Sequence, residues 1–206
     1  MLITDNDDRS RQGTLCRAEQ RHATGSILPA SSVFFALYPD PQTARRLDRI
    51  AWYLRHKHRL NGRPLADRRL HISLCNISDH ARPTSEAAAA IGEAMATITM
   101  PPFLVAFNQA KSFNGGQKQP IVLVGNDGVA GLMLFQRELV TALGKTGIWR
   151  RKPRPYNPHV TLLYDHCWIP DQPIEPISWM VREFVLVCSL QGQGRHIPLA
   201  RWPLRG

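Results

Sequence analysis

The stretch 34–40 reads Phe-Phe-Ala-Leu-Tyr-Pro-Asp, and the stretch 121–127 repeats its pattern as Ile-Val-Leu-Val-Gly-Asn-Asp. Each is a short apolar run that ends in turn-forming residues, as expected for a buried strand. Apolar residues at helical spacing follow both runs, and they predict amphipathic helices from Thr43 onward and over about 129–143. A second short apolar run closes each unit, at 70–74 and at 159–163. The sequence therefore predicts two strand–helix–strand units.

Both units end in the same pattern, His-x-Ser/Thr-Leu. Residues 71–74 read His-Ile-Ser-Leu, and residues 159–162 read His-Val-Thr-Leu. Asp40 precedes His71 by 31 residues and Asp127 precedes His159 by 32, so the units are nearly equal in length. Equal units predict a duplicated architecture of two lobes related by a pseudo-two-fold axis. That arrangement would place the two histidines across a shared cleft.

Strand geometry gives these motifs a chemical meaning, because residues i and i+2 of a strand point to the same face. His71 and Ser73 would project together, as would His159 and Thr161. Two imidazoles can divide proton donation and acceptance between them, and two hydroxyls can bind the oxygens of an anion. Such a set suits in-line attack at phosphorus, with cationic side chains offsetting the developing charge in place of a metal.

The rest of the chain predicts further strands and one more helix. Thr84 or Ser85 can cap a helix that runs to about Thr97. A strand is expected over 103–107, and a terminal hairpin over 181–190 and 196–202. Residues 1–31 have no sustained periodicity and are predicted to form a flexible tail, so the folded domain is 32–206.

Composition excludes several classes of protein. The chain has 206 residues, 43% of them hydrophobic, which is enough for one domain with a sizeable core. It has no apolar run of transmembrane length and no apolar signal segment. The cysteines are scattered without a metal-binding or disulfide spacing, so we expect buried thiols in a cytoplasmic protein; they are Cys16, Cys75, Cys167 and Cys188.

The net charge of +10 is concentrated after residue 31. Nine basic and two acidic residues lie in 41–70, and a second basic cluster lies in 145–154. Such patches attract polyanions, although a solvated basic surface would have the same composition. The charge thus indicates an anionic partner without identifying it.

At the paired motifs the sequence resembles the 2H phosphoesterase superfamily, and within it the 2′-5′ RNA ligase-like proteins, or RNA 2′,3′-cyclic phosphodiesterases. The similarity extends to Phe34-Phe35-Ala36-Leu37 with Pro39, to Asn157-Pro158 before the second motif, and to the terminal residues 199–204. It covers roughly residues 32–206. The resemblance implies an α+β, bilobal, duplicated fold in which two antiparallel sheets line a central cleft with helices outside.

The resemblance also implies metal-independent opening of a 2′,3′-cyclic phosphate to a 2′-phosphate, with reversible 2′-5′ RNA ligation as a further activity. By motif match His159 is the general base and His71 the general acid, although the local symmetry lets these roles exchange. Ser73 and Thr161 are the expected phosphate-binding residues. No metal and no cofactor is expected. RNA or oligonucleotide ends with a cyclic phosphate are the expected partners of a monomeric protein that does not bind membranes.

The sequence departs from the family at two places. Many members carry Arg three residues after the second-motif Thr, where this chain has Tyr164, and many carry Phe-Leu-Gly after the first motif, where residues 75–78 read Cys-Asn-Ile-Ser. Arg154, Lys152 or Arg69 could supply the missing charge, and Tyr156 or Tyr164 could stack on a base. Arg154, Tyr156 and Tyr164 are therefore candidate substrate contacts.

Two other functions remain compatible with the residues. A basic RNA-binding protein could keep the motifs without turning over a substrate, and its affinity would then depend on Arg and Lys and on salt. A cyclic phosphodiesterase could act on a small nucleotide metabolite instead of RNA.

Overall fold

A computed structural model describes residues 31–78, 83–147, 155–190 and 192–206. In chain order the elements in these ranges are β1 (Ser31–Leu37), α1 (Pro41–Lys57), the 3-10 turn η1 (Asp67–Arg69), β2 (Ile72–Ser78), α2 (Ser85–Ala96), β3 (Phe103–Ser112), β4 (Gln119–Val124), the 3-10 turn η2 (Asp127–Val129), α3 (Ala130–Lys145), β5 (His159–Asp165), β6 (Gln172–Val181), β7 (Glu183–Leu190) and β8 (Arg195–Pro203). Residues 1–30 of the predicted tail lie outside the described ranges, and its last residue, Ser31, begins β1.

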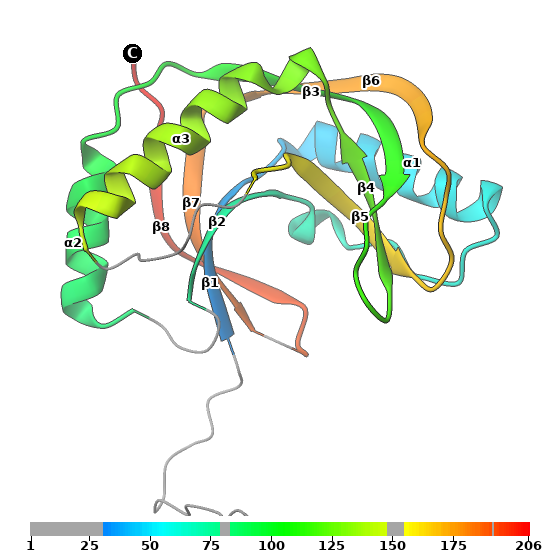
Figure 1. The fold of residues 1–206 in the computed structure, drawn as a ribbon, viewed down its shortest axis with the longest axis horizontal. Coiled ribbons are helices and arrows are strands. Elements are labelled where there is room, and N and C mark those ends of the chain that lie inside the picture. Colours follow the sequence, from blue (N-terminus) through cyan, green and yellow to red (C-terminus); the bar gives the residue numbers. More distant parts are fainter. Residues whose placement is uncertain (1–30, 79–82, 148–154, 191) are drawn as a thin grey trace, which may run out of the picture.

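The strands form one antiparallel sheet in the order β6-β3-β4-β5-β2-β1-β7-β8, so neighbouring strands are not always consecutive in the chain. The expectation of two separate sheets is therefore wrong. The physical reason is the pairing of Ile72 on β2 with Val160 on β5, which joins the two predicted units edge to edge. That junction is a single residue pair, and the arms on either side of it spread apart (Figure 1).

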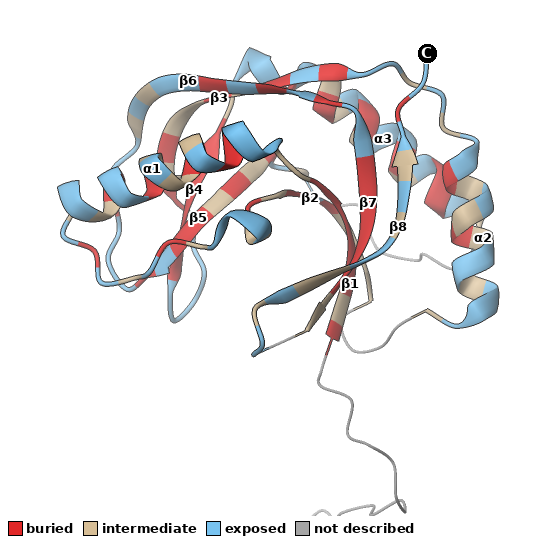
Figure 2. Ribbon diagram, turned by 180° about the vertical axis from the view of Figure 1, so that it is seen from behind, coloured by how far each residue is buried: buried red, intermediate tan, exposed pale blue. Residues whose placement is uncertain are grey.

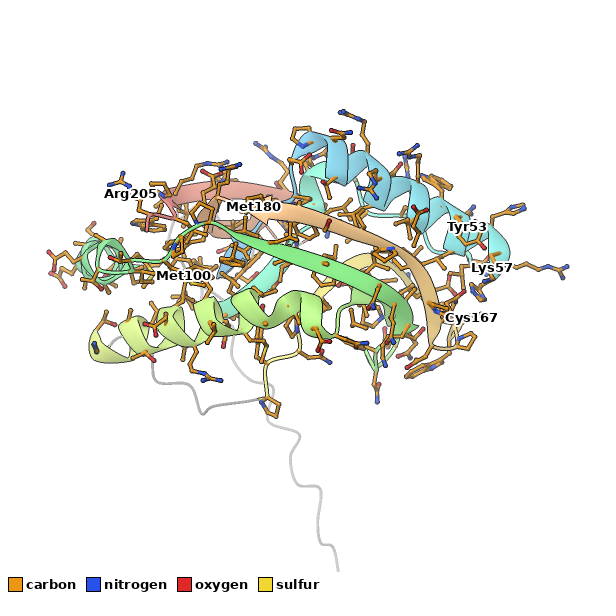
Figure 3. All side chains as sticks on the ribbon, turned by 90° about the horizontal axis from the view of Figure 1, so that it is seen from above. Tyr53, Lys57, Met100, Cys167, Met180 and Arg205 are labelled. Atoms are coloured by element: carbon orange, nitrogen blue, oxygen red, sulfur yellow. The ribbon has the colours of Figure 1, made fainter. Side chains whose placement is uncertain are left out.

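Each half of the sheet contains one of the repeated motifs at its inner edge. β6, β3, β4 and β5 form the half that ends at His159, and β2, β1, β7 and β8 form the half that begins after His71. The main hydrophobic core lies on one face of the sheet, where α1 and α3 pack from two sides (Figures 2 and 3). We call the opposite face, on which a smaller cluster of Phe34, Ala36, Val185 and Val187 lies, the motif face.

Local sequence explains where the first helix starts and which side it buries. The Asp40 carboxylate accepts hydrogen bonds from the backbone N–H groups of Gln42 (2.9 Å) and Thr43 (3.0 Å), and Pro41 occupies the first helical position. The buried residues of α1 include Leu47, Ala51 and Leu54, as the apolar stripe predicts. The basic side chains of the same helix are therefore directed away from the core.

One strand was not anticipated. β6 spans Gln172–Val181 and pairs with β3, whereas the sequence predicted a strand only from Val181 onward. The sequence did not predict this strand because it contains Pro173 and Pro176, and proline is rare in central strands. β6 lies at the edge of the sheet, where a missing backbone N–H costs little.

Most of the remaining elements agree with the prediction. The hairpin forms from β7 and β8, and Gly192 and Gly194 in its turn both have positive φ, at 76° and 59°. The thiols differ from expectation, because Cys188 is buried but Cys167 is exposed and Cys75 lies between; Cys16 is outside the described residues. In the described part of the chain, no helix is long and apolar enough to cross a bilayer.

Candidate active site

The β2–β5 pairing places all four motif side chains on one face of the sheet. Ile72 and Val160 are directly opposed, so their side chains share the core face, where both are fully buried. His71, Ser73, His159 and Thr161 are one residue away along their strands and therefore lie on the motif face. The duplicated units thus meet at their motifs, as predicted, although the meeting point is a strand pair within one sheet.

The imidazole of His71 is held at both nitrogens. Its Nδ1 lies 2.6 Å from the carbonyl oxygen of Arg69, and its Nε2 lies 3.0 Å from Ser73 Oγ. A carbonyl can only accept, so Nδ1 carries a proton and donates it to Arg69. In the neutral ring, Nε2 then accepts a hydrogen bond from the Ser73 hydroxyl.

The second motif repeats half of this arrangement. Nδ1 of His159 lies 2.8 Å from the carbonyl oxygen of Asn157, which is again two residues earlier in the chain. This contact fixes the same tautomer and leaves Nε2 directed away from the backbone. In both motifs, therefore, Nε2 is the ring nitrogen that does not contact the backbone.

The surroundings of the two rings differ. His71 is packed among three rings, with centroid distances of 5.2 Å to Phe34, 6.0 Å to Tyr38 and 5.0 Å to His196. Burial lowers the pKa of His71 to about 4, and the charges of His196, His159 and Arg69 add to the effect. His159 instead contacts Phe113 edge to face at 5.1 Å.

Tyr164 reaches the motif face because of a bulge in β5. Val122 pairs with Thr161 and Ile121 pairs with Leu163, which leaves Leu162 as an extra residue. Tyr164 pairs with Pro120, two residues from Val122 on β4, and therefore shares the face of Thr161. Its side chain is 45% exposed, as a surface for a substrate requires.

The other two predicted substrate contacts have different outcomes. The hydroxyl of Tyr156 donates to the carbonyl oxygen of Ser73 at 3.1 Å, while its ring packs against the core. Burial raises the pKa of Tyr156 above its ordinary range. Tyr156 therefore connects the segment before β5 to β2. Arg154 and the alternative Lys152 lie outside the described residues.

Sequence reasoning missed two residues around His71. The Tyr38 hydroxyl lies 3.1 Å from Nδ1 of His196, and both rings contact His71. Burial lowers the pKa of His196, and the charge of Arg69 lowers it further. His196 is 125 residues from His71 in the chain. Only the position of Tyr38 at the end of a predicted strand carried a local signal.

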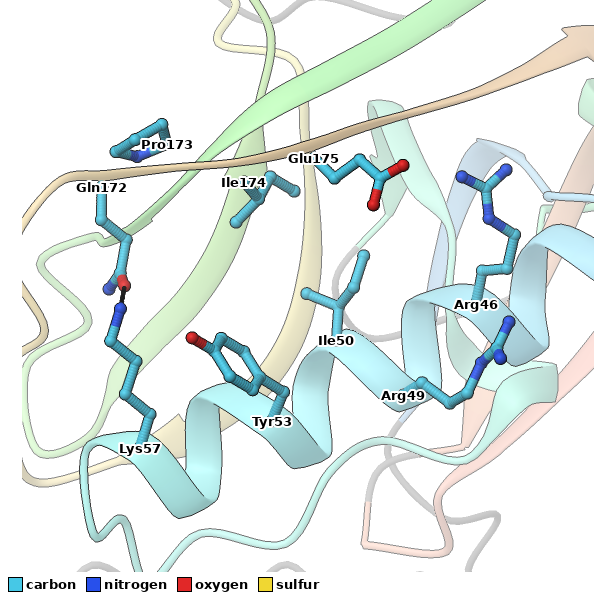
Figure 4. A pocket seen from close by; sticks show the side chains of 9 residues that line it. All are labelled: Arg46, Arg49, Ile50, Tyr53, Lys57, Gln172, Pro173, Ile174 and Glu175. Carbon is cyan, nitrogen blue, oxygen red and sulfur yellow. Dashed lines mark hydrogen bonds between the residues drawn. The ribbon is translucent and has the colours of Figure 1, made fainter.

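A groove of about 520 Å³ lies elsewhere, between α1 and β6. Figure 4 shows Arg46 and Glu175 pointing toward one another across it, and Lys57 Nζ donates to Gln172 Oε1 at 2.7 Å. Because α1 packs on the core face, this groove is separated from the motif face by the sheet. Within the described ranges, no three side chains of His, Cys, Asp or Glu gather to form a metal site.

Fold and site together define a class: an α+β protein with an antiparallel sheet, whose duplicated halves bring two His-x-Ser/Thr strands to one face, which is the arrangement of a two-histidine phosphoesterase. The model of the 2′-5′ RNA ligase superfamily matches residues 39–193. The chain belongs to the 2′-5′ RNA ligase superfamily, which confirms the resemblance stated from the motifs.

Individual relatives agree with this assignment. The RNA 2′,3′-cyclic phosphodiesterase of Escherichia coli K12 is 28% identical over 177 residues, covering 84% of this chain and 96% of the relative. A crystal structure described as a phosphoesterase has a TM-score of 0.70 at 27% identity, over 86% of this chain and 99% of the other. The crystal structure of E. coli LigT complexed with NADP+ has a TM-score of 0.68 at 26% identity, with the same coverage.

Proposed function

We propose that the chain is an RNA 2′,3′-cyclic phosphodiesterase that opens the cyclic phosphate to a 2′-phosphate without a metal ion. The observation that carries the proposal is the matched pair of histidines on the motif face, each with Nδ1 bound to the carbonyl two residues earlier. Two Nε2 atoms and two hydroxyls are thereby directed to one side of the sheet. The E. coli relative bears the name of this reaction.

The proposed reaction begins with water. His159 Nε2 removes a proton from a water molecule as its oxygen attacks phosphorus opposite the P–O3′ bond. The new P–O bond forms while the P–O3′ bond breaks, and His71 Nε2 gives a proton to the departing 3′ oxygen. The products are a 2′-phosphate and a 3′-hydroxyl, and the two histidines have exchanged protonation states.

The low pKa of His71 bears on its role as the acid. An imidazolium with a pKa near 4 is a strong acid, but at neutral pH the ring of the free protein is neutral, with a proton on Nδ1 and none on Nε2. A bound phosphate anion raises the pKa of a neighbouring imidazole, because opposite charge favours the protonated form. In this proposal the substrate therefore supplies the charge that allows His71 to hold its proton.

Ser73 and Thr161 are assigned to the non-bridging phosphate oxygens. In the free protein the Ser73 hydroxyl faces His71 Nε2 at 3.0 Å. Once that nitrogen is protonated it no longer accepts a hydrogen bond, so the hydroxyl is released to donate to the phosphate. Thr161 lies on the same face one strand away and donates from the other side.

The test uses a short RNA with a 2′,3′-cyclic phosphate end, purified protein and excess EDTA, with phosphorus NMR to follow the end group. We expect a 2′-phosphate with the wild type and none with the His71→Ala/His159→Ala double variant. A 3′-phosphate product would contradict the direction of opening. Bound RNA without any product would favour the RNA-binding alternative, and turnover of only a cyclic mononucleotide would favour a metabolite enzyme.

Ligation is the same chemistry with a different nucleophile. If the 5′-hydroxyl of a second RNA replaces water, its oxygen attacks phosphorus, the P–O3′ bond breaks and a 2′-5′ phosphodiester forms. The family name includes this activity. Adding an RNA with a free 5′-hydroxyl to the same reaction tests it, because a joined product with a 2′-5′ linkage resists ribonucleases that require a free 2′-hydroxyl.

A further inference from the structure

A second groove, of about 760 Å³, lies next to the candidate active site. Its walls come from the end of β1, the start of α1, η1, the corner between β6 and β7, and β8. Three arginines line it, namely Arg68, Arg182 and Arg201, together with Tyr38 and His196. Of these five residues, the sequence predicted an anion-attracting role only for Arg68, as part of the basic cluster in 41–70.

The groove is continuous with the surroundings of His71. Tyr38 and His196 line the groove, and their rings also contact the His71 ring, at 6.0 and 5.0 Å. Burial raises the pKa of Tyr38 to about 12, while the positive charge of Arg201 opposes that rise. The positive charge of Arg201 in the groove thus acts on Tyr38, whose ring contacts His71.

Sheet register confirms that the groove opens on the motif face. Ser73 pairs with Ala36, Ala36 pairs with Val185, and Val185 pairs with Arg201, so these residues form one row across four strands. Adjacent strands are spaced by about 4.8 Å, which puts the backbone of Arg201 about 14 Å from that of Ser73. The row crosses the small apolar cluster, which provides a floor between the two positions.

The acidic residues of the groove are already bound. Asp40 caps α1 and also accepts from the Thr43 hydroxyl at 2.6 Å, and Glu183 forms an ion pair with Arg201. Arg68 and Arg182 have no acidic partner among the residues that the structure describes, and both are exposed. Two guanidinium groups therefore remain to bind an anion next to the site, and guanidinium favours phosphate.

We propose that this groove binds the phosphodiester backbone of the nucleotides that precede the cyclic phosphate, so that the enzyme prefers an RNA strand to a mononucleotide. The inference rests on the proposed function. A ligand that occupies the motif face and the groove together must carry phosphates at intervals along one chain. An oligonucleotide has that form.

The test compares two substrates with one double variant. In the Arg68→Ala/Arg182→Ala protein, we expect kcat/KM for a five-nucleotide RNA with a cyclic phosphate end to fall roughly 10- to 100-fold, because two charged contacts to phosphate are lost. The value for cytidine 2′,3′-cyclic phosphate should change less than twofold. The slope of log kcat/KM against log salt for the RNA should become shallower by about 2.

A matched control is available on the other face. The Arg46→Ala/Arg49→Ala protein loses the same charge from the groove between α1 and β6 and should keep the wild-type preference for RNA. An equal loss in both double variants would overturn the proposal in favour of general electrostatic attraction. Equal effects on RNA and mononucleotide, or no effect on RNA, would also overturn it.

Failure of the proposed function has a different result, namely no turnover of either substrate by the wild type. In that case, fluorescence anisotropy with the same RNA carrying a 3′-phosphate decides the question. Weaker binding by the Arg68→Ala/Arg182→Ala protein than by the Arg46→Ala/Arg49→Ala protein supports the groove, and equal binding overturns it.

Discussion

The two motif strands hold their histidines by the same hydrogen bond to the backbone but in different surroundings. His71 and His159 each bind, through Nδ1, the carbonyl two residues earlier, at 2.6 and 2.8 Å. Burial among three rings lowers the pKa of His71, and the charges of His196, His159 and Arg69 add to the effect, whereas His159 contacts the ring of Phe113. The duplicated units thus share the backbone contact of their histidines and differ in the residues that pack around them.

The largest effect should come from removing either imidazole. His71→Ala and His159→Ala should each lower kcat by roughly a hundredfold to ten-thousandfold, because each removes one partner in proton transfer. Circular dichroism should report an unchanged fold. If one variant retained more than a tenth of the activity while the other lost it, the two motifs would not act as a pair.

A second experiment separates the two roles. A 3′-deoxynucleoside 2′-(4-nitrophenyl) phosphate diester keeps the P–O2′ bond and has a leaving group that needs no proton, so the acid becomes dispensable while the base does not. We expect His71→Ala to lose roughly tenfold less activity on this diester than on the cyclic phosphate, and His159→Ala to lose as much on both, measured by nitrophenolate release. The reverse pattern would exchange the roles of the two histidines.

The lowered pKa of His71 should also appear in the stability of the protein. The pKa of His71 is about 4 in the folded protein against 6.5 ordinarily, so the unfolded chain binds the extra proton. The unfolding free energy is therefore highest above pH 6.5 as far as His71 is concerned. It falls by roughly 3 kcal/mol at most as the pH falls to 4. Urea titrations at pH 7 and 4.5 should show a smaller decline for His71→Gln. Equal declines would mean that burial of His71 has little effect.

The smallest effect concerns the link between the motifs. Tyr156→Phe removes the hydroxyl that donates to Ser73 and should cost about 1 kcal/mol of unfolding free energy, the usual contribution of one such bond. Tyr53→Phe, on the exposed side of α1, is the control and should have no effect in the same urea titration. Identical midpoints for both variants would show that the Tyr156 contact contributes nothing measurable.

Local patterns predicted the elements and both motifs, because strand alternation, helical spacing and caps such as Asp40 depend on neighbours in the chain. They did not predict β6, because its two prolines are unusual in a strand and are tolerated there only at the edge of the sheet. They also did not reveal the side to which Tyr164 points, since a plain strand would direct residues three apart to opposite faces. The bulge at Leu162 reverses this outcome, and it is visible only in the register against β4.

The surroundings of His71 were beyond local reasoning for a similar reason. His196 reaches it through the fold of the terminal hairpin, and nothing near residue 196 in the sequence indicates a partner so distant in the chain. The expected pair of sheets was wrong because the repeat specifies two similar units but does not specify the pairing of Ile72 with Val160 that merges them.

The merged sheet has two outer edges, and each has its own protection against self-association. β6 contains Pro173 and Pro176, and β8 contains Pro198 and Pro203. A strand with prolines offers an interrupted row of N–H donors, which makes it a poor template for a strand from another molecule. The prolines thereby oppose extension of the eight-stranded sheet by strands of other molecules.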